Sequence, residues 1–214
     1  MRVAIVLALA YLLGSVLPAE LFARSQGLDI RAIGTGNPGT TNALRQLGLF
    51  PGVVTGVYDA SVGLASMYLA WRLGLAEGWV YAAGCAALLG HVFPLFSGFR
   101  GGQGMAAATG MLVWGIGRAV TLGLLGAPAL AGLFAVAAVA FVLTRSASVV
   151  GVFAVPVFVA QLLLACPGWQ FALFMSALGT LIWVTQLAMA REGRLLKLAD
   201  PVRQRFSRMR PHAR

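Results

Sequence analysis

Leu49–Trp71, with the sequence LFPGVVTGVYDASVGLASMYLAW, is apolar from end to end except for Asp59 and a few small polar residues. A helix needs roughly 20 residues to cross the ~30 Å hydrocarbon core of a bilayer, and this stretch is long enough. The rest of the 214-residue chain is similar, with 59% hydrophobic and 10% charged residues. A soluble domain of this size needs more charge on its surface, so the composition predicts an integral membrane protein.

The apolar stretches together predict an all-α fold, a polytopic membrane helical bundle of about seven spans. The fourth stretch is too short to cross unaided, which leaves a tilted helix, a thinned bilayer or a re-entrant loop. The first is interpreted as a retained helix and not as a signal peptide, because further spans follow it. The predicted spans are Val3–Phe22, Leu49–Trp71, Gly78–Phe96, Gly104–Ile116, Ala119–Leu143, Val149–Cys166 and Trp169–Met189.

Basic residues gather at the C-terminus, where half of the 16 Lys and Arg residues lie beyond residue 190. Because cytoplasmic segments carry an excess of Lys and Arg, the C-terminus is predicted to be cytoplasmic, and an odd number of crossings places the N-terminus outside. Orientation and anionic lipid then account for the net charge of +10, and nucleic acid is not an expected partner. The predicted organisation is one membrane-embedded domain, residues 1–190, and a basic cytoplasmic tail, residues 191–214.

The first cytoplasmic loop has the composition of an anion site and reads GTGNPGTTNALR from Gly34 to Arg45. Glycines let the backbone turn tightly and present N–H groups to a ligand, and Thr and Asn add short donors. A guanidinium group suits phosphate oxygens. The same residue types also form ordinary turns, so composition alone leaves both interpretations open.

A second polar segment, GHVFPLFSGFRGGQG, runs from Gly90 to Gly104 on the same predicted face. It contains His91, and the second of the chain's two histidines lies in the C-terminal tail. The basic, glycine-rich turn that follows opens the fourth predicted span, and a helix N-terminus favours an anion. A lone histidine within a membrane also serves as a hydrogen-bonded contact between helices, which is the alternative.

Two charged residues interrupt apolar surroundings elsewhere. A carboxylate within a span is costly unless it is paired, so Asp59 is expected to face the bundle interior with Arg45 or Arg100 as its partner. Arg145 lies in a third hydroxyl-containing turn, Leu143–Ser148. The simpler interpretation of Arg145, taken singly, is a side chain that extends to the lipid headgroups.

The sequence lacks the side-chain sets that many enzymes use. It shows no pair of carboxylates at an acid–base spacing, no His/Cys cluster for zinc and no Ser-His-Asp set. We therefore expect no metal and no cofactor. An enzyme built from these residues would take a substrate that arrives activated, and would stabilise developing charge with cations and backbone donors.

At these residues the sequence resembles the bacterial membrane-integral acyl-phosphate:glycerol-3-phosphate acyltransferases. Gly34–Arg45 is similar to that family's Gly-Ser-Gly-Asn-x-Gly-Ala-Thr-Asn-x-x-Arg. Gly90–Gly104 is similar to its Gly-His-x-Phe-Pro-x-Phe followed by Phe-Lys-Gly-Gly-Lys-Gly. The resemblance implies a seven-span bundle in the bacterial cytoplasmic (inner) membrane with its active face cytoplasmic. It implies transfer of an acyl group from acyl phosphate to glycerol 3-phosphate, giving lysophosphatidate for phospholipid synthesis, with membrane lipids as surroundings.

The resemblance also implies site residues. His91, Arg45 and Arg145 are expected to be catalytic, and Asp59 to have a structural or pairing role. The expected substrate-binding residues are Gly34, Thr35, Gly36, Asn37, Gly39, Thr40, Thr41, Asn42, Arg100, Gly101, Gly102, Gln103, Gly104 and Ser148.

The chain departs from the family pattern at three places. Gln103 and Val62 stand where the family has lysines, and Ala190–Leu195 keeps little of a third motif that begins with His-Arg. A charge-assisted hydrogen bond contributes roughly 1.5–3 kcal/mol, so these losses would slow the reaction greatly unless arginines such as Arg100, Arg191 or Arg194 compensate. A catalytically impaired relative that binds anionic lipid or substrate without turnover is therefore the alternative. A small transporter or channel is disfavoured, because no inverted repeat is visible.

Overall fold

The computed structural model describes residues 1–121, together with residues 123 and 180. The described part is helical, and the predicted spans 149–166 and 169–189, most of 119–143 and the tail 191–214 lie outside it. The elements are α1 (Arg2–Gly14), α2 (Pro18–Ser25), α3 (Thr40–Gln46), α4 (Leu49–Arg72), α5 (Glu77–Val92), the 3-10 helix η1 (Leu95–Ser97) and α6 (Met105–Thr121).

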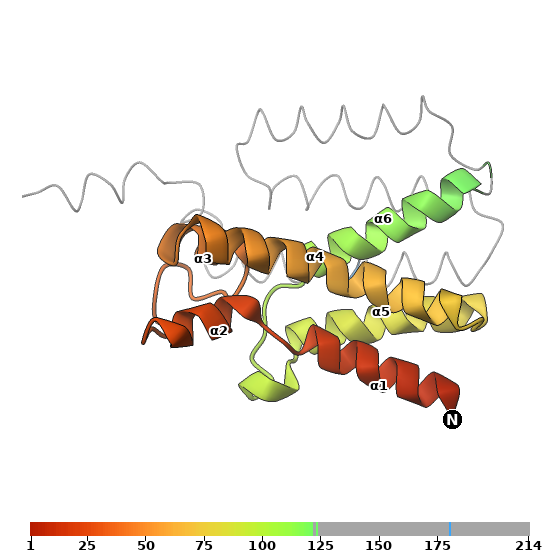
Figure 1. Ribbon diagram of the computed structural model, residues 1–214, viewed down its shortest axis with the longest axis horizontal. Helices are drawn as coiled ribbons and strands as arrows, with labels where there is room; N and C mark the ends of the chain where they lie inside the picture. Colours follow the sequence, from red (N-terminus) through yellow and green to blue (C-terminus); the bar gives the residue numbers. More distant parts are fainter. Residues whose placement is uncertain (122, 124–179, 181–214) are drawn as a thin grey trace, which may run out of the picture.

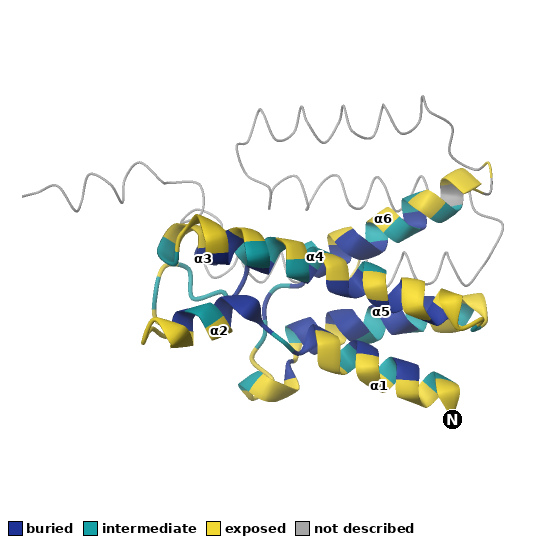
Figure 2. Cartoon of the chain, in the orientation of Figure 1, coloured by how far each residue is buried: buried dark blue, intermediate teal, exposed yellow. Residues whose placement is uncertain are grey.

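The long helices pack side by side, and the short ones lie at one end. Helix α1 packs on α5, and α4 packs on both α5 and α6 (Figure 1). Helices α2 and α3 lie at the end of the bundle opposite the N-terminus and contact α4. The buried faces of the long helices point toward one another, and their exposed faces carry large apolar side chains (Figure 2). This pattern is expected of helices whose outer surface faces lipid.

Two described helices, α4 and α5 extended through η1, are long and apolar enough to cross a membrane. The bent pair of α1 and α2 makes a third if it is counted as one span. Helix α4 coincides with the predicted span Leu49–Trp71 to within one residue. The predicted span Gly78–Phe96 is interrupted earlier, at Val92, because Pro94 cannot continue an α-helix.

The predicted first span, Val3–Phe22, is not one continuous helix. It is divided into α1 and α2, whose axes are bent by 42°. Proline has no backbone N–H and disfavours the helical region in the residue before it, and Leu17 accordingly adopts an extended conformation before Pro18. The bend is therefore encoded locally, and it directs α2 toward the loops that surround the candidate site.

The predicted fourth span, Gly104–Ile116, was drawn too short. Helix α6 continues to Thr121, so it includes the first residues of the predicted fifth span. The continuation passes through Arg118, whose guanidinium lies 3.2 Å from the carboxylate of Glu77 at the start of α5. The helix therefore continues through a charged residue that has a partner on α5.

Two cores hold the described residues together. The larger one joins the long helices and includes Met67, Ala83, Ala87 and Met111, none more than 2% exposed. The smaller one consists of Ala19, Ala23, Ile30 and Ala43, and it joins α2, the α2–α3 loop and α3. This smaller core fixes the loop against the end of the bundle, which positions the polar residues that follow it.

Candidate active site

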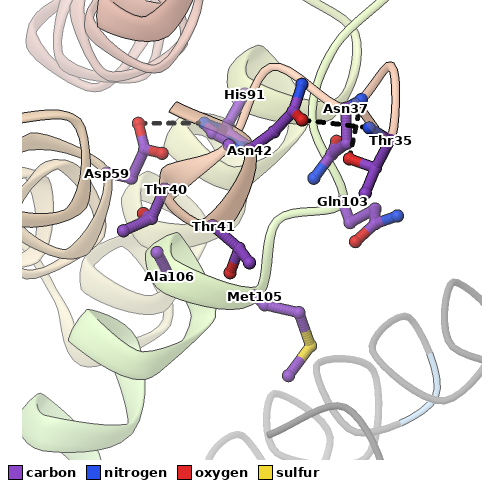
Figure 3. A pocket seen from close by; sticks show the side chains of 11 residues that line it. Thr35, Asn37, Thr40, Thr41, Asn42, Asp59, His91, Gln103, Met105 and Ala106 are labelled. Atoms are coloured by element: carbon purple, nitrogen blue, oxygen red, sulfur yellow. Dashed lines mark hydrogen bonds and ion pairs between the residues drawn. The ribbon is translucent and has the colours of Figure 1, made fainter. Parts of the chain in front are cut away.

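A cavity of about 190 Å³ lies where the α2–α3 loop meets the loop before α6. Its walls come from both polar segments that the sequence singled out, together with helices α4 and α6 (Figure 3). The lining residues are Thr35, Asn37, Gly39, Thr40, Thr41, Asn42, Asp59, His91, Gln103, Met105 and Ala106.

The α2–α3 loop is folded around the side chain of Asn42. Its Nδ2 donates to the backbone oxygens of Ile30 at 3.2 Å and Ile33 at 3.1 Å, and its Oδ1 accepts from the N–H of Thr35 at 3.0 Å. Gly34 has a φ of +60°, and a side chain there would collide with Asn42 Oδ1. The carboxamide of Asn42 is thus committed to shaping the loop, and Thr35 is held at the cavity wall.

The floor of the cavity contains a buried acidic and basic pair. Nδ1 of His91, on α5, lies 3.6 Å from Oδ1 of Asp59, on α4. That separation is too long for a hydrogen bond, and both atoms lack a hydrogen-bond partner within the described part of the chain, as does Oγ1 of Thr40. Buried polar atoms in proteins are nearly always partnered, so these three atoms are suited to receiving the polar atoms of a ligand.

The glycine-rich turn lies directly on the end of α5. The N–H of Gly101 donates to the oxygen of Val92 at 3.1 Å, and the N–H of Gly102 donates to the oxygen of His91 at 3.0 Å. A methyl group at Gly102 would collide with Nε2 of the His91 ring, so only glycine allows this approach. Gln103 follows the turn and lies at the cavity wall beside Thr35 and Asn37 (Figure 3).

The predicted site residues fall into three groups. Nine line the cavity, and Asp59 is among them. Gly34, Gly36, Arg45, Arg100, Gly101, Gly102 and Gly104 lie in the surrounding segments and are not part of its lining, with the side chain of Arg45 exposed in the last turn of α3. Arg145 and Ser148 lie outside the described residues. The functional roles assigned to all of these residues stay predictions.

Sequence reasoning did not find two features of the cavity. It named Arg45 or Arg100 as the partner of Asp59, whereas the basic side chain that the structure places beside Asp59 is His91. The cost of burying two ionisable side chains in neighbouring spans was a usable signal for this pairing. Met105 and Ala106 of α6 also line the cavity, and nothing in their chemistry marked them beforehand.

The helical fold and its likeness to a solved membrane protein define a multi-pass integral membrane protein. The chain superimposes on the crystal structure of PlsY, an integral membrane glycerol 3-phosphate acyltransferase, in its glycerol 3-phosphate form. The TM-score is 0.75 at 29% identity, covering 91% of this chain and 94% of that chain. For the lysophosphatidic acid form the TM-score is 0.72 at 28% identity, covering 92% and 98% of the two chains.

Residues 4–192 match the glycerol-3-phosphate acyltransferase family, and the chain belongs to that family. The glycerol-3-phosphate acyltransferase of Geobacter sulfurreducens is 47% identical over 109 residues, which are 51% of this chain and 56% of that protein. The enzyme of the same name from Thioalkalivibrio sulfidiphilus is 47% identical over 105 residues, 49% and 52% of the two chains. These alignments thus span about half the length of the curated relatives. The predicted family and membrane class are confirmed.

Proposed function

We propose that this protein transfers an acyl group from acyl phosphate to glycerol 3-phosphate and so makes lysophosphatidate. The observation that carries the proposal is the single cavity lined by Thr35 and Asn37 from the first motif and by His91 and Gln103 from the second. Family membership supports the same reaction, and so does the likeness to PlsY in its glycerol 3-phosphate and lysophosphatidic acid forms.

The reaction needs no base from the protein. The 1-hydroxyl oxygen of glycerol 3-phosphate attacks the carbonyl carbon of acyl phosphate, and a new ester bond forms. The bond between that carbon and the phosphate oxygen breaks, and the departing phosphate takes up the hydroxyl proton. The task of the site is to hold two anions and to stabilise charge on the carbonyl oxygen, which positioned donors and cations can do.

The two motifs divide these tasks. Arg45, with Asn37, Thr40, Thr41 and Asn42, holds one phosphate, and Asn42 contributes by shaping the loop through its three hydrogen bonds. The turn Gly101–Gly104, His91 and Arg145 hold the second phosphate or the reacting carbonyl oxygen. Each motif places one buried polar atom without a hydrogen-bond partner among the described residues at the cavity floor, Oγ1 of Thr40 and Nδ1 of His91, which supports this division.

The proposed topology is a bundle of about seven spans in the bacterial cytoplasmic membrane, with an external N-terminus and a cytoplasmic C-terminus. Residues 1–190 form the membrane-embedded acyltransferase domain, and residues 191–214 form the basic cytoplasmic tail. The active face is cytoplasmic. The concentration of Lys and Arg beyond residue 190 supports the orientation, and so does the position of both motif loops at the end opposite the N-terminus (Figure 1).

The reaction is tested with purified protein in lipid, supplied with palmitoyl phosphate and glycerol 3-phosphate, by measuring lysophosphatidate. Arg45→Ala is expected to lower kcat/KM at least about hundredfold, since it removes a cation from a phosphate site. Arg72→Ala is the matched control, because Arg72 also lies in the last turn of a helix but at the other end of α4. Equal losses in the two variants would contradict the assigned role of Arg45.

Gln103 favours a second candidate function, an impaired relative that binds substrate without turnover. An amide supplies hydrogen bonds at the cavity wall but no charge. Binding of glycerol 3-phosphate by the wild-type protein, measured calorimetrically, with no lysophosphatidate formed would favour this candidate. Appearance of turnover in Gln103→Lys would then identify the residue responsible.

A further inference from the structure

Arg31 connects three segments of the chain behind the cavity. Its Nη1 donates to Oε2 of Glu20 on α2 at 2.8 Å, and its Nη2 donates to the backbone oxygen of Arg100 in the loop before α6. Its own backbone N–H donates to Oδ1 of Asp29 at 2.9 Å. Arg31 is not among the cavity-lining residues, so any effect it has on the cavity is exerted through other groups.

The pair of Glu20 and Arg31 is largely shielded from solvent. The side chain of Glu20 is 8% exposed and that of Arg31 is 25% exposed. Removing Arg31 would leave the shielded Glu20 carboxylate with Arg24, whose side chain is 63% exposed, as its remaining ion-pair partner within the described residues. A guanidinium has donors in a fixed planar arrangement, so one arginine can serve a carboxylate and a carbonyl at a set angle. A lysine ammonium lacks that geometry.

Arg31 is connected to both walls of the cavity, to one through its place in the chain and to the other through its contact with Arg100. On one side, Arg31 lies between Ile30 and Ile33, whose backbone oxygens are bonded by Asn42, the residue that also holds Thr35. On the other side, Arg100 directly precedes Gly101 and Gly102.

Both glycine amides donate to backbone oxygens at the end of α5, where His91 lies, and Gln103 comes next. The guanidinium therefore joins the wall that carries Thr35 to the wall that carries Gln103.

We infer that Arg31, oriented by Glu20, is a positioning residue that fixes the two motif loops relative to each other and so sets the spacing of the cavity walls. Only the kinetic test of this role rests on the proposed function, because it measures the effect of Arg31 on catalysis. Its structural effect, on the turn at Gly101 and Gly102, can be measured without any turnover.

The structural test compares Arg31→Gln with Arg24→Gln in the full-length protein. Arg24 pairs with the same carboxylate, but its side chain is 63% exposed, and within residues 1–121 its ion pair is with Glu20 alone. Hydrogen exchange at Gly101 and Gly102, followed by mass spectrometry, is expected to rise about tenfold in Arg31→Gln and to stay within about twofold of wild type in Arg24→Gln.

The kinetic test uses palmitoyl phosphate and glycerol 3-phosphate. Arg31→Gln removes none of the proposed binding groups and changes only the spacing between them. Misplacement of reacting groups lowers the rate of the chemical step, so kcat is expected to fall at least about tenfold while KM for glycerol 3-phosphate changes less than about threefold. A general loss of folded protein would lower the active fraction without changing exchange at Gly101 and Gly102 in the molecules that remain folded.

Arg31→Lys separates the contact with Glu20 from the contact with the Arg100 oxygen. It also provides the test if Arg31→Gln does not fold. Lysine keeps a positive charge beside Glu20 but cannot serve Glu20 and the Arg100 oxygen in the same geometry. It is expected to retain the thermal midpoint of the wild type and still show faster exchange at Gly101 and Gly102.

Wild-type exchange in both Arg31 variants would overturn the inference, and so would equal exchange in Arg31→Gln and Arg24→Gln. Absence of turnover in the wild-type protein would count against the proposed function alone.

Discussion

Asn42 and Asp59 line the same cavity and are equally buried, each 1% exposed, but their polar atoms are used differently. Asn42 makes three hydrogen bonds to the backbone of its own loop. Asp59 has an oxygen with no hydrogen-bond partner in the described residues, beside the equally unpartnered Nδ1 of His91. Burial alone therefore does not distinguish these two residues of the cavity, whereas their hydrogen bonds do.

The largest expected effect follows from removing the imidazole at the cavity floor. His91→Ala is expected to lower kcat/KM at least about hundredfold, because loss of one positioned donor to a developing oxyanion has an effect of this size. Acyl transfer from palmitoyl phosphate is the measurement, with the thermal midpoint recorded in parallel. The thermal midpoint should fall moderately, because the buried ring leaves a void, although Nδ1 has no hydrogen-bond partner to lose within the described residues.

Ser66→Ala is the control for His91→Ala. Ser66 is also buried, and its hydroxyl lacks a partner among the described residues, but it does not line the cavity. Its kcat/KM should remain within about twofold of wild type. A large loss of kcat/KM in Ser66→Ala would mean that buried polar atoms of α4 affect activity without lining the cavity.

Asn42→Ala is expected to affect stability more than His91→Ala does. It leaves two backbone oxygens and one N–H in the α2–α3 loop without their partner, at about 1–3 kcal/mol for each buried group left unsatisfied. The thermal midpoint should fall clearly, and kcat/KM should fall about tenfold as the loop loses its shape. A wild-type thermal midpoint with full loss of activity would reverse the comparison and place Asn42 in direct contact with substrate.

The sequence predicted the long helices well where one property dominates. Continuous apolarity was sufficient for α4, but it also concealed the bend at Pro18, because an apolar segment reads as one span whatever its backbone does. The helix α3 was missed, since its seven residues are too few to show a period. Helix α6 extends past the predicted Ile116 to Thr121, where Arg118 pairs with Glu77, a residue distant in sequence.

The candidate site shows the same limit. Residue types identified both polar segments, and the structure brings them to one cavity. The partners of Asn42 are backbone atoms of Ile30, Ile33 and Thr35, which carry no sequence signature. The approach of Asp59 to His91 depends on how α4 and α5 are aligned lengthwise, and spacing within a single sequence does not give that alignment.

Gly102→Ala tests the close contact between the second motif and the cavity floor. The added methyl group collides with Nε2 of the buried His91 ring, so the ring or the turn must move. We expect kcat to fall about tenfold, less than for loss of the ring itself, since the imidazole is displaced and not removed. Gly117→Ala is the control, because a methyl group there meets nothing within 4 Å and should leave kcat unchanged.

The smallest expected effect concerns the hydroxyl of Thr40. Like Asp59, Thr40 has a polar atom without a hydrogen-bond partner in the described part of the chain, and like Asn42 it lies on α3. Thr40→Val keeps the methyl group that packs near Gly56 and removes only the hydroxyl. A neutral hydrogen bond contributes about 0.5–1.5 kcal/mol, so kcat/KM should fall roughly two- to tenfold with no loss of thermal midpoint.

Thr40→Ser makes the opposite change at the same position, because it keeps the hydroxyl and removes the packing methyl group. It should retain kcat/KM within about twofold and lose some thermal stability, since a buried methyl group contributes about 0.8 kcal/mol. If Thr40→Val instead lowers the thermal midpoint and leaves kcat/KM unchanged, the hydroxyl belongs with Asn42 as part of the scaffold. The donor left at the floor for the second phosphate or the carbonyl oxygen would then be Nδ1 of His91.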